Sequence, residues 1–209
     1  MKIIVGVTGA SGSIYGVRLL EVLHQAYPDV ESHLIVSRAG RRVLRHETAY
    51  DEADLARWAD VHHPEADIGA APASGSAGFD TMVVTPCSVK TLAQIAHGTG
   101  DTLVGRAADV ILKEGRRLVL VVREMPLSAI HLENMLKLSR LGVMILPASP
   151  GFYFHPKTLA DLVDHVVGKT LNAIGLEQNL FEKWRGQGPA GRKGHFLPED
   201  GGIGGESVN

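Results

Sequence analysis

The side chains best suited to ligand binding or proton transfer follow the ends of predicted strands. They are the turn Thr8–Gly12 and then Ser37, Ser88, Arg123 and Glu124. Short Val/Ile/Leu-rich runs precede them, and such runs are typical of strands in a buried parallel sheet. Parallel strands end at one edge, where open α/β sheets bind their ligands. This convergence of hydroxyls, glycines and one charged pair predicts a site for a polar ligand that carries phosphate.

The turn between Gly9 and Gly12 joins a predicted strand to a predicted helix. Its glycines would let the backbone approach a ligand while the helix directs its first N–H groups there. The same turn could need glycine for its backbone angles alone, but its place between strand and helix favours phosphate or cofactor binding. Ser88 precedes a second helix, and for this serine alone a plain N-cap is the simpler interpretation.

Charged residues near this edge allow two interpretations each. Arg123 and Glu124 could form a surface ion pair, but their position favours a charge anchor beside a proton-transfer group. Glu47 follows a predicted helix and by pattern alone is a solvated charge. Arg106 and Lys113 lie seven residues apart on one predicted helix and so share a face, either as a basic rim or as a solvated one.

Composition excludes several classes of function. Lys and Arg total 21 against 23 Asp and Glu, and this near balance argues against a surface for nucleic acid or anionic membrane. No apolar run is long enough to span a bilayer, and the start has no signal-peptide layout, so we expect a cytoplasmic protein. The one cysteine, Cys87, is expected to be a small packed residue rather than a nucleophile. The ten histidines show no metal-ligand spacing, and His62 and His63 fall in a predicted loop.

Strands and helices alternate along the chain, which predicts a doubly wound parallel sheet with helices on both faces. The predicted strands are 2–8, 32–37, 79–85, 118–122 and 143–147. The predicted helices are 13–27, 39–46, 51–58, 89–97, 103–113, 131–140 and 159–174. The stretch 62–78 is predicted to be a loop. Residues 1–185 form one predicted domain, and the Gly-rich residues 186–209 form a tail outside its core.

A dehydrogenase interpretation comes second. The first turn is similar to that of short-chain dehydrogenases, and Tyr153 and Lys157 have the spacing of the catalytic pair in those NADP-dependent enzymes. That pair needs a helix, whereas Pro156 lies inside this segment and predicts a loop. Ser37 and Arg38 end the second predicted strand, where a dinucleotide site would place an acid for the ribose.

Six motifs in order resemble those of the UbiX-type flavin prenyltransferases, over roughly residues 2–184. The motifs are Thr8–Gly12 with Tyr15-Gly16, Pro72–Ser76, Pro86–Thr91, Arg106–Glu114, Arg123–Met135 and Pro147–Tyr153. The resemblance implies a flavodoxin-like or Rossmann-like three-layer α/β/α fold that binds FMN. It implies transfer of a dimethylallyl group from dimethylallyl phosphate to N5 and then C6 of reduced FMN, without a metal. It also implies that prenylated FMN passes to a UbiD-type decarboxylase, and that members form dodecamers with sites at subunit contacts.

The resemblance also implies roles for individual residues. The flavin would be held by Gly9, Ala10, Ser11, Ser37, Ser88, Val89, Lys90, Thr91 and Arg123. Ser11 and Glu124 would move protons, and Glu47 matches an acid near the reacting flavin edge. Lys113, Tyr153 and Lys169 match a clamp on the donor phosphate, with Arg106 beside it. Cations and a hydroxyl donor suit a departing phosphate dianion.

The chain departs from some members at two positions. Lys169 stands where some have arginine, which keeps the charge but loses a bidentate donor. Ile68 stands where some have tryptophan, which removes an aromatic wall near the prenyl group. Related flavin-dependent cysteine decarboxylases usually show Pro-Ala-Ser-Ala-Asn-Thr in this loop. The chain has Gly75-Ser76 instead, which argues against their activity and leaves a decarboxylase-like flavoprotein as the weaker alternative. The choice between a monophosphate and a diphosphate donor stays open.

Aromatic residues predict self-association. Phe152, Tyr153 and Phe154 lie together in a segment with no helix of its own to bury them. Clustered exposed apolar groups usually mark an interface. We therefore expect a homo-oligomer whose assembly completes the site.

Overall fold

One parallel sheet organises the chain. A computed structural model describes residues 1–184 and 186 and contains six strands in the order β3-β2-β1-β4-β5-β6. The strands are β1 (Lys2–Val7), β2 (Glu31–Val36), β3 (Val61–His63), β4 (Thr81–Cys87), β5 (Arg117–Val122) and β6 (Met144–Pro147). Every neighbouring pair is parallel. The predicted doubly wound α/β fold is therefore confirmed.

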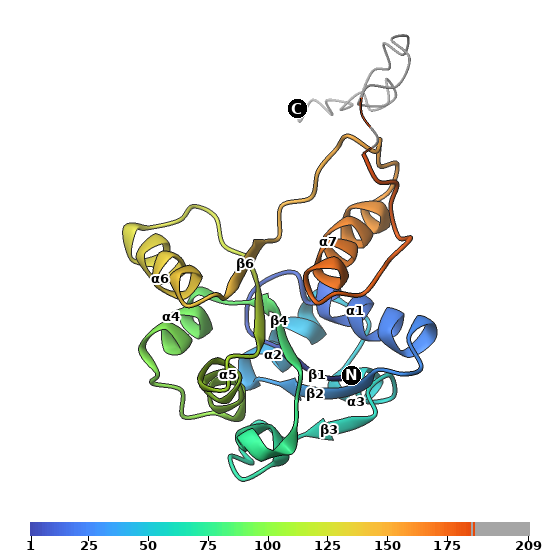
Figure 1. The fold of residues 1–209 in the computed structure, drawn as a ribbon. Helices are drawn as coiled ribbons and strands as arrows, with labels where there is room; N and C mark the ends of the chain where they lie inside the picture. The colour runs from blue at the N-terminus through green and yellow to red at the C-terminus, as the bar shows by residue number, and fades with distance from the viewer. Residues whose placement is uncertain (185, 187–209) are drawn as a thin grey trace, which may run out of the picture.

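Helices cover both faces of the sheet. They are α1 (Ser13–Ala26), α2 (Arg38–Glu47), α3 (Glu52–Ala56), α4 (Val89–His97), α5 (Leu103–Lys113), α6 (Ala129–Arg140) and α7 (Leu159–Ala173). Figure 1 shows α4, α5 and α6 on one side of the sheet and α1 and α7 on the other. Two cores result, because strand side chains alternate between the faces. Val5 and Val83 belong to the α1–α7 core, whereas Ile4 and Val84 belong to the core on the other face.

The order of the strands fixes where a ligand can bind. The chain runs outward from β1 to β3 and then crosses to β4 on the other side of β1. The loops after β1 and β4 therefore diverge and leave a crevice between them, which is where this kind of sheet binds its ligands. The turn Thr8–Gly12 and the residue Ser88 lie at this point.

Two glycines allow close packing beside this crevice. A Cβ on Gly40 would lie 2.5 Å from the carbonyl oxygen of Val7, and a Cβ on Gly9 would lie 2.5 Å from the Cβ of Ala39. Both distances are too short for a larger residue without movement of the backbone. Glycine at both positions therefore lets α2 rest directly against the first turn.

The sequence prediction was wrong in one segment and displaced by a few residues at several ends. The supposed loop 62–78 begins on β3 and contains two short 3₁₀ turns, Ala71–Ala73 and Gly75–Ala77. His62 and His63 therefore lie on an edge strand rather than in a loop, and His63 accepts or donates a 2.8 Å hydrogen bond with the buried His33. Nearly all of the predicted tail 186–209 lies outside the described residues. Within the described part of the chain, no helix has both the length and the apolar character needed to cross a bilayer.

Candidate active site

The ends of β1, β4 and β5 are joined by hydrogen bonds. The Thr8 hydroxyl donates to the carbonyl of Pro86 (2.7 Å) and accepts from the N–H of Ser88 (2.9 Å). The N–H of Arg123 donates to the carbonyl of Cys87 (3.3 Å). These bonds hold the first turn, the start of α4 and the end of β5 at fixed positions. The structure thus confirms that the residues singled out after these strands share one edge.

Ser37 and Ser88 both cap helices. The Ser37 hydroxyl accepts from the N–H of Gly40 (2.9 Å) at the start of α2. Ser88 accepts from the N–H of Thr91 (3.2 Å) and contacts the Thr91 hydroxyl (3.0 Å) at the start of α4. The N-cap interpretation of Ser88 is confirmed. Two helices therefore begin at this edge and direct their first N–H groups towards it, which favours an anionic ligand.

Glu47 is tied to the glycine turn, contrary to its expectation as a free solvated charge. It is the last residue of α2, and its carboxylate accepts from the N–H groups of Gly12 (2.8 Å) and Ser13 (3.0 Å). Burial opposes its ionisation, but the bonds from Ser11, Gly12 and Ser13 outweigh this and hold its pKa below the ordinary value. Glu47 is therefore an anion fixed at the start of α1.

Tyr15 is a site residue that sequence reasoning used only as part of a motif. Burial raises the pKa of its hydroxyl, and the nearby charge of Arg123 partly opposes this. Arg123 also acts on Glu47. Its place in the sequence could have indicated this role, because Tyr15 follows the glycine turn closely and lies in the first turn of α1. The Tyr15 ring occupies the space that a Cβ on Gly12 would need. Tyr15, Glu47 and Arg123 thus form one electrostatic group around the turn.

Arg123 and Glu124 do not form an ion pair with each other within the described residues. Both are exposed just beyond β5. The Glu124 carboxylate accepts from the N–H of its neighbour Met125 (3.0 Å). One oxygen of this carboxylate therefore stays available to exchange a proton at the ligand edge.

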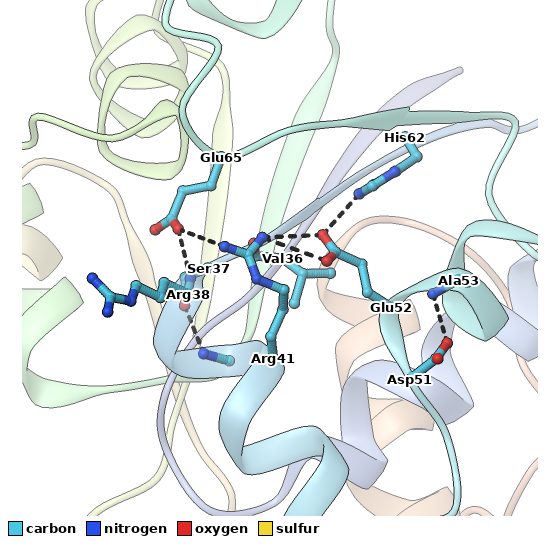
Figure 2. A network of polar contacts seen from close by, with 10 residues as sticks. Val36, Ser37, Arg38, Arg41, Asp51, Glu52, Ala53, His62 and Glu65 are labelled. Atoms are coloured by element: carbon cyan, nitrogen blue, oxygen red, sulfur yellow. Dashed lines mark hydrogen bonds and ion pairs between the residues drawn. The ribbon is translucent and has the colours of Figure 1, made fainter.

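A basic groove lies beside the turn along α2. It has a volume of about 880 Å³ and is lined by Ser11 and Glu47 together with Arg38, Arg41, Arg42, Val43, Arg45 and His46. Figure 2 shows Arg41 turned towards two carboxylates, and its guanidinium lies 3.3 Å from Glu52 and 3.7 Å from Glu65. The side chains of Arg38 and Arg42 form no ion pair within the part of the chain described. The groove therefore keeps excess positive charge next to the ligand edge.

A second cavity lies on the other side of Glu47. It measures about 770 Å³ and is lined by residues of α1, α2 and α7, among them Ile14, Tyr15, Leu162 and Val163. Its walls are largely apolar. The basic groove and the largely apolar cavity therefore both border the carboxylate of Glu47.

The predicted phosphate residues divide into two groups. Tyr153 and Lys169 both lie beside His165 on α7, with 5.7 Å between the ring centres of Tyr153 and His165. Lys113 instead ends α5, four residues before β5 begins, so it lies at the opposite edge of the sheet, where it pairs with Glu114. Arg106 lies in the first turn of α5 and is 3.7 Å from Asp109. One copy of the chain therefore does not bring Lys113 to Tyr153 and Lys169.

Two simpler interpretations also hold. Burial raises the pKa of Cys87 to about 12, so the residue stays a packed thiol. The segment from Tyr153 to Lys157 is not helical, since α7 begins only at Leu159. The tyrosine–lysine spacing therefore does not form a dehydrogenase pair. Among the residues that the structure describes, no group of three or more His, Cys, Asp or Glu side chains is placed to hold a metal ion.

Residues 1–171 match the family model described as Flavoprotein. A protein of Escherichia coli O157:H7, named probable UbiX-like flavin prenyltransferase, is 54% identical over 89% of this chain and 94% of its own length. The flavin prenyltransferase LpdB of Lactiplantibacillus plantarum is 51% identical over 88% of this chain and 98% of its own length.

Solved structures show the same similarity. A dodecameric FMN-dependent UbiX-like decarboxylase from Escherichia coli O157:H7 superposes with a TM-score of 0.87 at 54% identity, covering 89% of this chain and all of its own. AnUbiX (PadA1), in complex with FMN and dimethylallyl pyrophosphate, gives a TM-score of 0.87 at 43% identity, covering 90% of this chain and 98% of its own.

Proposed function

Because this chain belongs to the flavoprotein family and, within it, to the UbiX-like flavin prenyltransferases, we propose that it transfers a dimethylallyl group from dimethylallyl phosphate to reduced FMN. The new bonds form at N5 and then at C6 of the flavin. Reduced FMN, when bound, supplies these two nucleophilic atoms. The observation that carries the proposal is the joining of the glycine turn, the α4 N-terminus and Arg123 at the point where the strand order reverses.

The residues at this edge fit FMN. The glycine turn brings backbone to the mouth of the crevice, and the start of α4 offers N–H groups beside Ser88. We propose that the flavin is held by Gly9, Ala10, Ser11, Ser37, Ser88, Val89, Lys90, Thr91 and Arg123. The basic groove along α2 adds attraction for its phosphate. This set suits one phosphate-bearing planar ligand. The end of β2 itself carries no acid for a dinucleotide ribose, and the Glu65 carboxylate that lies there is occupied by the N–H of Arg38 and by the guanidinium of Arg41.

The chemistry needs a phosphate to leave and protons to move. As the C–O bond of the donor breaks, the electron pair stays on the phosphate, whose negative charge Lys169 and Tyr153 would stabilise. Glu124 and Ser11 would take up and return the protons that bond formation releases. Glu47, fixed as an anion on the first turn, would hold that turn and face the reacting edge. Cationic side chains can meet this charge demand, so we propose that no metal ion takes part.

A second copy would complete the phosphate clamp. Lys113 lies at the opposite edge of its own sheet and is exposed, so it can reach a donor only in another subunit. Phe152 is 51% exposed beside the site, as an interface residue should be. Since a dodecamer is known for a similar protein, we propose a homo-oligomer, most simply a dodecamer. A UbiD-type decarboxylase as recipient of the product and a cytoplasmic location stay predictions.

We expect the purified protein to bind FMN and not NADP⁺. The reason is the hydroxyl-rich edge at which helices begin, where the nearby Glu65 carboxylate is already occupied by Arg38 and Arg41, together with the failure of Tyr153 and Lys157 to share a helix. Equilibrium titrations with the two ligands test this. Tight binding of NADP⁺ without binding of FMN would favour a dehydrogenase instead.

A further inference from the structure

His165 is a buried histidine beside the donor-phosphate residues. It lies on α7 and is 6% exposed. Its Nδ1 accepts a 3.3 Å hydrogen bond from the N–H of Gly151. This bond ties α7 to the start of the segment that carries Tyr153.

Aromatic rings enclose the imidazole. Phe154 stacks on it with 5.0 Å between ring centres and an angle of 6° between the planes. Tyr153 meets it edge-on at 5.7 Å, and Phe181 packs at 4.5 Å. A movement of the imidazole would disrupt its contacts with all three rings at once. The imidazole therefore holds the loop Gly151–Phe154 in place.

Gly168 allows this enclosure. A Cβ on Gly168 would lie 2.6 Å from the ring of Phe181 and 2.8 Å from the side chain of Gln178. The segment after α7 can therefore fold back along the helix and close over His165 only because residue 168 has no side chain.

The arrangement requires a neutral imidazole. Since Nδ1 accepts a bond, the ring proton sits on Nε2, which is buried without a partner within the described residues. A second proton would have to go on Nδ1, where it would face the N–H of Gly151, a donor against a donor. Burial and the charge of Lys169 lower the pKa of His165 below its ordinary value. Tyr153 is a further titratable residue in contact with the imidazole, and no carboxylate among the described residues shifts the pKa of His165.

His165 and Lys169 also face one cavity. It measures about 450 Å³ and is lined by both residues, by Ser149 and by the end of β6. The two residues are one helical turn apart. A movement of the loop against His165 would therefore shift Tyr153 relative to Lys169.

We infer that His165 is a positioning residue for the donor phosphate: its neutral ring holds the loop Gly151–Phe154, and protonation of the ring releases the loop. The inference rests on the proposed role of Tyr153 and Lys169 at that phosphate. The affinity for dimethylallyl phosphate then falls on acidification, whereas the affinity for FMN does not.

Two variants separate the acceptor from the ring. His165→Phe keeps an aromatic ring but leaves the partly buried N–H of Gly151 without its acceptor. The cost of this unpaired N–H predicts a KM for dimethylallyl phosphate raised about 10-fold. His165→Gln offers an acceptor that does not titrate and should keep a KM closer to that of the unchanged protein. Because the pKa of His165 lies below the ordinary histidine value of about 6.5, the ratio of wild-type to variant KM for His165→Phe should stay low at neutral pH and rise towards one only as the pH falls below that value. Use of the ratio removes the ionisation of the donor phosphate itself, which falls in the same range.

A second measurement does not depend on activity. Trp184 lies 5.9 Å from Tyr153, and Trp58 is the other tryptophan of the chain. In a Trp58→Phe background, Trp184 fluorescence of the protein alone should change on acidification, and His165→Phe should already show the shifted fluorescence at neutral pH and change little on acidification. If this change appears but no prenyl transfer occurs, the positioning role stands and the proposed function fails. A KM and a fluorescence profile that are both unaltered in His165→Phe would overturn the inference.

Discussion

Replacing Glu124 with glutamine is expected to slow prenyl transfer by about 10²–10⁴-fold while FMN stays bound, which is the usual contribution of a general acid–base group. Glutamine has nearly the same size and keeps an acceptor for the N–H of Met125, which now bonds to Glu124 at 3.0 Å. The substitution removes the negative charge of the carboxylate and with it the ability to exchange a proton. The backbone bond of Arg123 to Cys87 stays in place and keeps the end of β5 at the site.

Single-turnover rates at equal FMN occupancy measure this effect. Glu133→Gln on α6 is the matched control, since Glu133 is also exposed and close in sequence but lines neither cavity at the ligand edge. The control should keep the wild-type rate. A wild-type rate in Glu124→Gln would remove Glu124 from the mechanism.

Replacing Lys169 with alanine should raise the KM for dimethylallyl phosphate by roughly 10- to 100-fold, the size expected for loss of a charged hydrogen bond. Lys169 is exposed on α7 and lines the cavity that it shares with His165. It lines neither of the two cavities beside the glycine turn, so FMN affinity should change little. An ammonium holds a phosphate as a point charge, so Lys169→Arg should keep much of the activity.

Steady-state kinetics and FMN titration of the two variants decide the assignment. Lys137→Ala on α6 removes an exposed cation elsewhere and should leave both constants unchanged. An equal loss of FMN affinity and donor use in Lys169→Ala, or no change in either, would show that Lys169 does not hold the donor phosphate.

Periodicity predicted the elements that carry a strong local signal. The helices Val89–His97 and Leu103–Lys113 have the predicted bounds, because apolar residues recur at helical spacing and Ser88 and Thr102 cap them. The strand β3 was missed because it has three residues and is held by pairing with β2 rather than by its own pattern. His63 looks solvated in sequence but is partly buried on this strand, where it stacks against His33, whereas His62 stays exposed.

The site was predictable where it follows strand ends and not where it depends on contacts between distant segments. The positions of Ser88 and Arg123 follow from the parallel sheet alone. The bonds from Gly12 and Ser13 to Glu47 join residues more than 30 positions apart, and no local pattern indicates them. The contact of His165 with Gly151 likewise arises only when α7 folds back beside the loop.

The separation of Lys113 from Tyr153 has a topological cause. A helix that leads into a parallel strand ends at the amino edge of the sheet, so α5 places Lys113 away from the loop that follows β6. The sequence motifs contain both residues but do not show at which edge of the sheet each one lies. If Lys113 contacts the donor phosphate, it must therefore do so from another copy of the chain.

The identity of the product is the most direct test of the proposed prenylation of FMN. The protein should be incubated without oxygen with reduced FMN and dimethylallyl phosphate, and the released flavin analysed by mass spectrometry, with Glu124→Gln as the paired sample. We expect the flavin from the wild-type protein to gain the mass of one five-carbon prenyl unit and the paired sample to gain it far more slowly. Recovery of FMN of unchanged mass from fully loaded wild-type protein would contradict the proposed function.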